Sequence, residues 1–394
     1  MRQRGFDAVA EYSRKFDGFG LTRSNTAVTP QEFREARALV SIAERRAIIE
    51  MKRRIEGFAK FQRAAIKDIM RKTREGTTAL VFKPVERIGV YVPGGRAPLF
   101  SSLVMAAVPA RCAGVKDIVV CTPPQKDGKV NPFVLVAAEA CGVNKVFKIG
   151  GAQAIGAMAY GLDRVMAPVD LICGPGNAFV SAAKQQAAAG GTRIDVPAGP
   201  SEALVIADGS VSPAFVAADM LAQAEHGPDS AAICICTSAK AAAMVAAELE
   251  RQLAALPPGS PARQSIPKWG RIFVAKSVEE AVEAANEFAP EHLELLVKGA
   301  GRLVPLVRNV GAVFVGTAEA FCDYGMSGGN HILPTGAAAR AWSGVSVQTF
   351  GKLVYVDELT GAAQRKLAAV SARLARMEGL EAHARAAEAR DANG

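Results

Sequence analysis

The stretch RIGVYVPGGRAPLFSSLVMAAVPARCAGVKDIVVCTP, residues 87–123, decides which fold this chain can adopt. Its two short apolar runs, 87–93 and 117–123, have the length and composition of buried strands. The Ala-rich segment 101–114 between them stops at a glycine, as helices commonly do. A strand, a glycine turn, a helix and a second strand at this spacing form a βαβ unit, which implies a parallel sheet.

The alternation of strands and helices continues along the chain in two series. The first series adds strands at 145–150 and 170–174, again separated by Ala-rich helices. Strands of the second series are expected at 202–208, 231–237, 271–276, 293–298 and 311–316. Two series of similar size suggest an internal duplication. The sequence therefore predicts an α/β fold with two Rossmann-like parallel-sheet units, an N-terminal helical segment and a C-terminal helical tail.

Changes in this pattern divide the chain into four predicted parts. Helices fill 6–75, the stretch VPAGPSE at 196–202 separates the two series, and a last helix is expected over about 357–388. The stretch LPPGSPARQSIP at 256–267 is expected to be a surface loop. Residues 1–86 form an N-terminal helical segment that is expected to pack with the second α/β unit. The first Rossmann-like unit is expected at 87–200, the second at 201–345 and the tail at 346–394.

The composition is that of a globular protein, with 50% hydrophobic and 22% charged residues. No apolar run reaches the ~18 residues that a membrane span needs, and the first residues lack the apolar core of a secretory signal. The seven cysteines are scattered and form no CxxC pair, which is typical of a reducing compartment. We expect a cytoplasmic protein without a membrane partner.

Most of the net charge of +9 lies near the N-terminus, where residues 1–76 hold 18 Lys and Arg against 10 Asp and Glu. Nucleic-acid binding is one interpretation of such a basic segment. Apolar residues recur there at helical spacing, as at Ile48, Ile55 and Phe58, so the charges fit the solvated face of amphipathic helices better. We therefore expect no nucleic-acid partner.

Three glycine turns follow predicted strands of the first series: VPGGRAP at 92–98, IGGAQAIG at 149–156 and CGPGNAF at 173–179. Each joins a strand to a helix, and the last opens a helix in the context that suits an anion. The carboxyl ends of parallel strands are where open α/β folds bind ligands. The GxGxxG fingerprint is absent, so each turn taken singly is better explained as a tight turn.

Histidine is scarce, and its four positions are informative: His226, His292, His331 and His383. A lone histidine is more often structural than functional, yet His226 stands one helical turn after Gln223, on the same helix face. Asp323 lies eight residues before His331. Nitrogen and oxygen ligands without thiolate suit Zn²⁺ or a similar divalent metal.

The adjacent pair Glu291 and His292 supplies two groups that can act as bases near neutral pH if their surroundings adjust the pKa values. Together with the candidate metal ligands, this pair favours a metal-assisted enzyme.

Eight motifs in order resemble the histidinol dehydrogenase family, and the resemblance runs from EYSRKFDG to MEGLEAH over nearly the whole chain. They are YVPGGRAPLFSS, GGAQAIGAMAYG, GPGNAFV, PAGPSEALVIAD, QAEHGPDS, APEHLEL, DYGMSGGNHILPT and EGLEAH. The resemblance implies an NAD⁺-dependent, zinc-dependent oxidation of L-histidinol through L-histidinal to L-histidine, the last step of histidine biosynthesis. Two NAD⁺ would accept the four electrons.

Motif by motif, the resemblance also assigns site residues. It implies that one zinc per subunit is held by Gln223, His226, Asp323 and His383, with His383 supplied by the partner subunit of a homodimer through the C-terminal tail. His292 would be the base that takes the alcohol proton, and Glu291 would activate the water that adds to the aldehyde. Positions that match NAD contacts are Tyr91, Gln153 and Asn177. Positions that match substrate contacts, besides the metal ligands and His292, are Ser201, Glu319, His331 and Glu378.

Two other interpretations remain open. A paralogous zinc- and NAD-dependent dehydrogenase could oxidise another polar alcohol, such as a sulfonated diol. The acidic and imidazole groups at Glu319, His331 and Glu378 suit a cationic amino alcohol better, because a sulfonate calls for a basic residue. A non-catalytic basic binding module would not need the Glu291–His292 pair.

Overall fold

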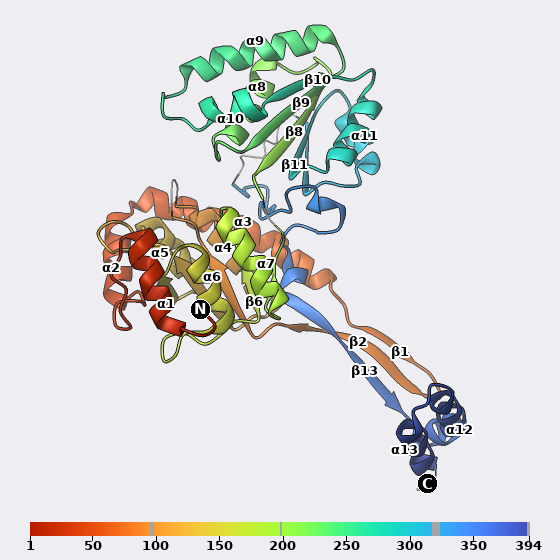
Figure 1. Cartoon of the computed structure of the whole chain (residues 1–394). Helices are drawn as coiled ribbons and strands as arrows, with labels where there is room; N and C mark the ends of the chain where they lie inside the picture. Colours follow the sequence, from red (N-terminus) through yellow and green to blue (C-terminus); the bar gives the residue numbers. More distant parts are fainter. Residues whose placement is uncertain (95–97, 198, 317–323, 392–394) are drawn as a thin grey trace. The chain divides into compact units, whose positions relative to one another are not determined.

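The computed structural model describes the 394-residue chain except residues 95–97, 198, 317–323 and 392–394 (Figure 1). The chain divides into two compact units. The larger unit joins Met1–Phe61 to Val85–Phe350 and holds both parallel sheets, and the smaller unit joins Gln62–Pro84 to Gly351–Gly394.

The first sheet contains five parallel strands in the order β5-β4-β3-β6-β7. These strands are β3 (Arg87–Tyr91), β4 (Asp117–Thr122), β5 (Lys145–Lys148), β6 (Leu171–Cys173) and β7 (Arg193–Ile194). The helices between them are α4 (Phe100–Ala113), α5 (Pro132–Ala140), α6 (Gly151–Tyr160) and α7 (Ala178–Ala189). The predicted βαβ pattern is confirmed, and the two-residue strand β7 is an addition too short for its sequence to reveal.

The second sheet repeats this topology, with the order β10-β9-β8-β11-β12. Counted from its own first strand, each sheet has the order 3-2-1-4-5, which agrees with the expected duplication. The strands are β8 (Glu202–Ala207), β9 (Ala231–Cys236), β10 (Arg271–Val274), β11 (His292–Leu296) and β12 (Ala312–Val315). The helices are α8 (Pro213–Ala224), α9 (Ala239–Ala255), α10 (Ala262–Trp269), α11 (Val278–Phe288) and the 3₁₀ segment Ala300–Leu306.

Helices cover both faces of the second sheet. Figure 1 shows α8, α9 and α10 on one side and α11 on the other, and the strand residues alternate between two apolar clusters accordingly. Val205 and Cys234 pack in one apolar cluster with side chains of α8 and α9, whereas Leu204 and Ile233 pack in the other with side chains of α11. Helix α10 lies partly in the stretch predicted to be a surface loop. Its prolines at the start and within the last turn conceal a short helix from sequence analysis.

The N-terminal helices are α1 (Gly5–Tyr12), a π-helical turn (Ser13–Asp17), α2 (Pro30–Leu39) and α3 (Ile42–Ala65). We expected this segment to pack with the second α/β unit. Helices α1 and α2 instead contact α6 and α5 of the first, whereas Ile55 and Phe58 of α3 lie beside Gly325 and Gly328 of the second. Phe6 and Val9 of α1 enter the apolar cluster that holds Ile155 and Met158 of α6. Burial of these side chains fixes α1 on the first sheet.

The smaller unit contains an antiparallel sheet in the order β1-β2-β13, with α12 against α13 (Figure 1). Its elements are β1 (Ile69–Lys72), β2 (Gly76–Pro84), β13 (Gly351–Leu359), α12 (Gly361–Met377) and α13 (Glu381–Asp391). Helix was expected through residue 75 and again from about 357, so these strands correct the prediction. Strand β13 pairs with β2 over nine residues, a partner far away in the sequence.

The remaining segments are short 3₁₀ turns at Ala338–Arg340 and Val347–Phe350. Among the helices in the described ranges, none has the length and apolar character needed to cross a membrane.

Candidate active site

The three glycine turns follow β3, β5 and β6, so all three stand at the carboxyl edge of one sheet, as predicted. Tyr91, the last residue of β3, links two of them. Its hydroxyl accepts a hydrogen bond from the backbone N–H of Gly151 at 3.0 Å. A Cβ added to Gly174 would lie only 2.1 Å from the carbonyl oxygen of Tyr91. Gly174 has φ +123°, so only glycine fits this close approach.

Gln153, on the first turn of α6, is buried and points toward the N-terminal segment. Its side-chain Nε2 donates a hydrogen bond to Oδ2 of Asp17 at 3.1 Å. Asn177 is exposed and caps α7, because its Oδ1 accepts hydrogen bonds from the backbone N–H groups of Phe179 and Val180. The structure therefore brings Tyr91 and Gln153 to one turn and places Asn177 at the next strand end.

A buried ion pair supports the third turn from behind. Lys184 of α7 and Asp195 form this pair, and their side chains are 3% and 0% exposed. Asp195 accepts a hydrogen bond from Gly174 N at 2.7 Å, and Lys184 donates one to Gly174 O at 3.0 Å. Both backbone groups of one glycine are thus held by opposite charges, which fixes the orientation of the turn.

The Glu291–His292 pair lies at the amino ends of β11 and β8. The backbone of Glu202 contacts both side chains: its N–H donates to Oε2 of Glu291 at 3.1 Å, and its carbonyl oxygen lies 3.3 Å from Nδ1 of His292. Parallel pairing of β11 with β8 sets this geometry, since His292 stands opposite Ala203. Ser201 comes directly before Glu202, and its carbonyl accepts the N–H of Ala231.

A second imidazole completes this cluster. Nδ1 of His331 lies 3.4 Å from Nε2 of His292, and the two ring centroids are 5.5 Å apart. Phe314 of β12 contacts both rings, at 5.9 and 5.6 Å between centroids. If Nδ1–H of His292 donates to the Glu202 carbonyl, then Nε2 is the basic atom of that ring, and it faces His331.

Burial acts in opposite senses on the two catalytic candidates. It raises the pKa of Glu291 to about 8, with a smaller contribution from the Glu202 carboxylate. Burial, together with the neighbouring His331 and His226, lowers the pKa of His292 to about 3. His292 is therefore neutral across the physiological range, whereas Glu291 changes its ionisation near it.

The candidate metal ligands are only partly brought together. Gln223 on α8 is fully buried, and neither its Oε1 nor its Nε2 has a hydrogen-bond partner among the described residues. His226 is exposed just beyond the end of α8. Asp323, like the substrate candidate Glu319, lies outside the described residues. In the ranges that are described, no three His, Cys, Asp or Glu residues form a group that could hold a metal.

Glu378 and His383 belong to the smaller unit. Glu378 directly follows α12 and His383 lies in the first turn of α13, and both are exposed.

Known proteins resemble the chain along almost its entire length. The family model described as histidinol dehydrogenase matches residues 1–391. Histidinol dehydrogenase of Xanthomonas campestris pv. campestris (strain 8004) is 46% identical over 391 residues, which cover 98% of this chain and 89% of that protein. The enzyme of Bacteroides thetaiotaomicron is 44% identical over 393 residues, covering 99% and 90%.

A crystal structure of histidinol dehydrogenase from Elizabethkingia anophelis matches with a TM-score of 0.90 and 39% identity, covering 98% of this chain and 88% of that one. The chain belongs to the histidinol dehydrogenase family. It is therefore an oxidoreductase by family. An acetylating aldehyde dehydrogenase from Geobacillus thermoglucosidasius, with a TM-score of 0.51 and 14% identity over 83% of this chain, shares the fold alone.

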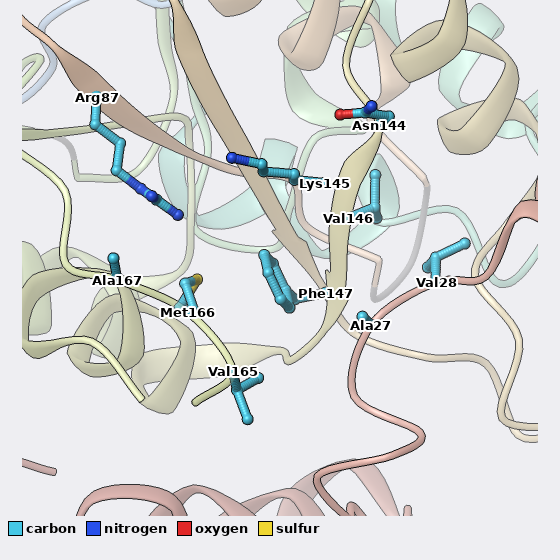
Figure 2. A pocket seen from close by; sticks show the side chains of 10 residues that line it. All are labelled: Ala27, Val28, Arg87, Asn144, Lys145, Val146, Phe147, Val165, Met166 and Ala167. Carbon is cyan, nitrogen blue, oxygen red and sulfur yellow. The ribbon is translucent and has the colours of Figure 1, made fainter. Parts of the chain in front are cut away.

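A cavity of about 370 Å³ lies apart from the residues that the histidinol dehydrogenase motifs single out (Figure 2). Arg87 and Lys145, which begin β3 and β5, reach it together with the ring of Phe147. It therefore lies toward the amino edge of the first sheet, whereas the glycine turns lie at the carboxyl edge. Both cations already pair with Asp117 at 2.8 Å.

Four residues that contact the glycine turns or the Glu291–His292 pair were not predicted from the sequence. Asp17 lies in the motif EYSRKFDG, but nothing in the sequence assigned it a role. The backbone of Glu202 gives no sequence signal, because any residue supplies an N–H and a carbonyl. Lys184 and Asp195 each look like ordinary surface charges, and only their mutual burial reveals their role.

Proposed function

We propose that this chain oxidises L-histidinol to L-histidine through L-histidinal, with two NAD⁺ and a bound zinc ion, and thereby completes histidine biosynthesis. The observation that carries the proposal is the cluster at the amino ends of β8 and β11, where the buried pair Glu291 and His292 lies beside the half-buried His331. Two bases with opposite pKa shifts, side by side, suit two successive proton transfers at one carbon.

In the first half-reaction His292 is the base. An alcohol carbon gives up a hydride readily only as its hydroxyl proton leaves, so a neutral acceptor must stand beside the hydroxyl. Nε2 of His292 is that acceptor, because its other nitrogen is engaged by the Glu202 carbonyl and burial keeps the ring neutral. His331, next to the same Nε2, holds the substrate hydroxyl in place. The products of this half-reaction are the aldehyde, a protonated His292 and NADH, which would carry the hydride.

In the second half-reaction Glu291 is the base. Water adds to the aldehyde carbon and gives up a proton to the Glu291 carboxylate, which forms the alkoxide of the hydrated aldehyde. Loss of a second hydride from this alkoxide gives the carboxylic acid, so four electrons leave the carbon in total. The backbone N–H of Glu202 fixes one carboxylate oxygen of Glu291, which leaves the other oxygen for the water. Both bases serve one carbon because they are consecutive residues.

The residues present fit a zinc ion at Gln223 and His226. Burial of an amide with both polar atoms unpaired costs about 1–3 kcal/mol or more, and within the described part of the chain Gln223 has such an amide. A cation beside its oxygen would remove part of this cost, and His226 follows one helical turn later. When bound, the zinc would orient the substrate through its imidazole and amino group. Asp323 and His383 are the other proposed ligands, and Ser201, Glu319 and Glu378 the further substrate contacts.

The carboxyl edge of the first sheet is the proposed NAD⁺ site. Tyr91, Gln153 and Asn177 stand at the three glycine turns there, where open parallel sheets hold dinucleotides. When bound, NAD⁺ accepts one hydride in each half-reaction. The lysine and aspartate behind Gly174 keep this edge rigid before the cofactor arrives.

We further propose a homodimer in which His383 and Glu378 complete the site of the neighbouring subunit. Two observations support this arrangement. Both residues are exposed in a compact unit built from Gln62–Pro84 and Gly351–Gly394, and α12 exposes apolar side chains, with Val370 and Leu374 each 57% exposed. Such a surface is expected to be covered in an assembly.

The direct test is NAD⁺ reduction by the purified, zinc-loaded chain with L-histidinol, beside a panel of other polar alcohols that includes sulfonated diols. We expect L-histidinol to give the highest kcat/KM by a wide margin. His292→Asn is the matched control, because it keeps a hydrogen-bonding side chain but lacks the imidazole base. A higher kcat/KM for a sulfonated diol would assign the chain to a different alcohol and contradict the proposal.

A further inference from the structure

Asp17 occupies an unusual place for a residue so near the N-terminus. It ends the π-helical turn Ser13–Asp17, and Gly18 follows in the left-handed region with φ 65°. This turn directs the carboxylate at the start of α6. Oδ2 accepts a hydrogen bond from Nε2 of Gln153 at 3.1 Å. A Cβ added to Gly150 would lie 2.9 Å from Oδ1, so this oxygen lies against the Gly150 backbone. The carboxylate therefore borders the second glycine turn.

Nucleotide-binding sheets of this topology place an acid where the ribose binds. That acid usually follows the first glycine turn by ~20 residues and accepts the 2′-hydroxyl of the adenosine ribose. In this chain the strand after the first turn, β4, ends at Thr122 and continues with two prolines and a glutamine. The usual position thus offers no carboxylate to a ribose.

Contacts around Pro123 show that Asp17 reaches this position from elsewhere in the chain. A Cβ added to Gly150 would lie 2.6 Å from Cβ of Pro123 and 2.9 Å from Oδ1 of Asp17. A Cβ on Gly94, in the first turn, would meet Pro123 Cγ at 2.7 Å. Pro123, just after β4, therefore lies against both glycine turns, and the second turn also lies against the Asp17 carboxylate. The absence of a Cβ at Gly94 and Gly150 allows these close approaches.

The charge of Asp17 is not neutralised by a cation in the described part of the chain. Burial raises its pKa, against hydrogen bonds from Ser13, Gln153 and the backbone of Gly150, and the described residues give it no ion pair. Lys148, which ends β5, is itself buried and pairs with Glu32 at 2.5 Å. A carboxylate without a counter-ion at this edge can accept a hydrogen bond from a hydroxyl group, whereas it repels a phosphate.

We propose that Asp17 accepts the 2′-hydroxyl of the adenosine ribose of NAD⁺ and makes the chain discriminate against NADP⁺. The inference rests on the proposed function, since it places NAD⁺ at the carboxyl edge of the first sheet. NADP⁺ carries a phosphate at the same 2′ position, so it loses this hydrogen bond and meets the carboxylate instead. Gln153 positions the carboxylate by donating to its other oxygen.

The test is calorimetric binding of NAD⁺, 2′-deoxyadenosine NAD⁺ and NADP⁺ to the full chain, together with the KM of each cofactor. Asp17→Asn keeps an oxygen that can accept the Gln153 hydrogen bond but removes the charge. We expect NAD⁺ to bind the variant about tenfold or more weakly, because the lost hydrogen bond is to a charged group. The preference for NAD⁺ over NADP⁺ should fall by about the same factor, with kcat little changed.

Asp127→Asn is the matched control. It makes the same change of charge in the loop after β4, where Asp127 accepts the N–H of Lys129 in its own turn. This variant should bind all three cofactors as the parent does. The assignment would be overturned if Asp17→Asn kept the parent's preference for NAD⁺ over NADP⁺. It would also be overturned if Asp127→Asn lost this preference and Asp17→Asn did not.

The 2′-deoxy cofactor keeps the inference testable if Asp17→Asn does not fold. The parent chain should bind it about tenfold more weakly than NAD⁺, and equal binding would contradict a contact at this hydroxyl. Failure of the proposed function looks different, since the parent chain would then bind neither NAD⁺ nor NADP⁺ and would reduce neither with L-histidinol.

Discussion

Glu291→Gln should separate the two halves of the reaction. Glutamine keeps the size of the side chain and can still accept the hydrogen bond from the Glu202 N–H, but it cannot take a proton from water. General-base assistance is typically worth ~10²–10⁴ in rate. We therefore expect the oxidation of L-histidinal to fall by about this factor. The first hydride transfer from L-histidinol should change far less, because its base is His292.

The pH dependence of the parent enzyme follows from the same two groups. The pKa of Glu291 is about 8 in the chain by itself, so at pH 7 only about one carboxyl in eleven is ionised and able to act as a base. A cation at Gln223 and His226 lowers this pKa. Aldehyde oxidation should therefore rise with pH to a plateau, with a midpoint at or below about 8 and a gain of up to about tenfold above pH 7. His292, with a pKa of about 3, stays neutral, so the alcohol step should be flat.

Single-turnover mixing measures each half-reaction separately, with L-histidinol or L-histidinal added to enzyme and NAD⁺ between pH 6 and pH 9. Circular dichroism of Glu291→Gln checks that the fold is intact. One result refutes the division of labour: equal slowing of both half-reactions by Glu291→Gln. Glu291 would then only orient His292, whose Nδ1 lies 3.8 Å from its carboxylate.

Three further predictions concern the metal, the assembly and the nucleotide edge. Chelation should abolish activity and leave the circular dichroism spectrum largely unchanged, and full activity in a verified metal-free sample would exclude the metal. Inactive His226→Ala and His383→Ala subunits should regain activity when mixed under exchange conditions, whereas no recovery despite proven exchange would mean that each tail serves its own subunit. Lys184→Met should cost about 3–5 kcal/mol in urea unfolding, because it leaves Asp195 charged and buried, and unchanged stability would argue against this pair.

Much of the fold could be predicted because the buried strands carry their own signal. Parallel strands covered on both faces are continuous apolar runs, as in β9, and glycines mark the turns that follow β3, β5 and β6. The antiparallel strands of the smaller unit were missed for the opposite reason. Most residues of β13 are exposed, and its partner β2 lies more than two hundred residues away in the sequence. A local pattern of exposed residues does not reveal such a pairing.

The candidate site could be predicted as a set of residues but not as an arrangement. The motifs point to Glu291 and His292, yet no motif indicates that a backbone N–H and carbonyl of Glu202 would hold both. The amino-edge position of this pair also differs from the carboxyl-edge rule that located the glycine turns. Asp17 was missed because its contact with Gln153 spans 136 residues. Contacts of this range depend on the packing of α1 against α6.

In the proposed reaction, one site oxidises a single carbon twice. The stoichiometry of the complete reaction is the sharpest test of this proposal. L-histidinol is mixed with a catalytic amount of zinc-loaded enzyme and excess NAD⁺, and NADH and L-histidine are counted at completion. We expect two NADH and one L-histidine for each L-histidinol consumed, with no L-histidinal accumulating in solution. One NADH per L-histidinol, with the aldehyde as the final product, would contradict it.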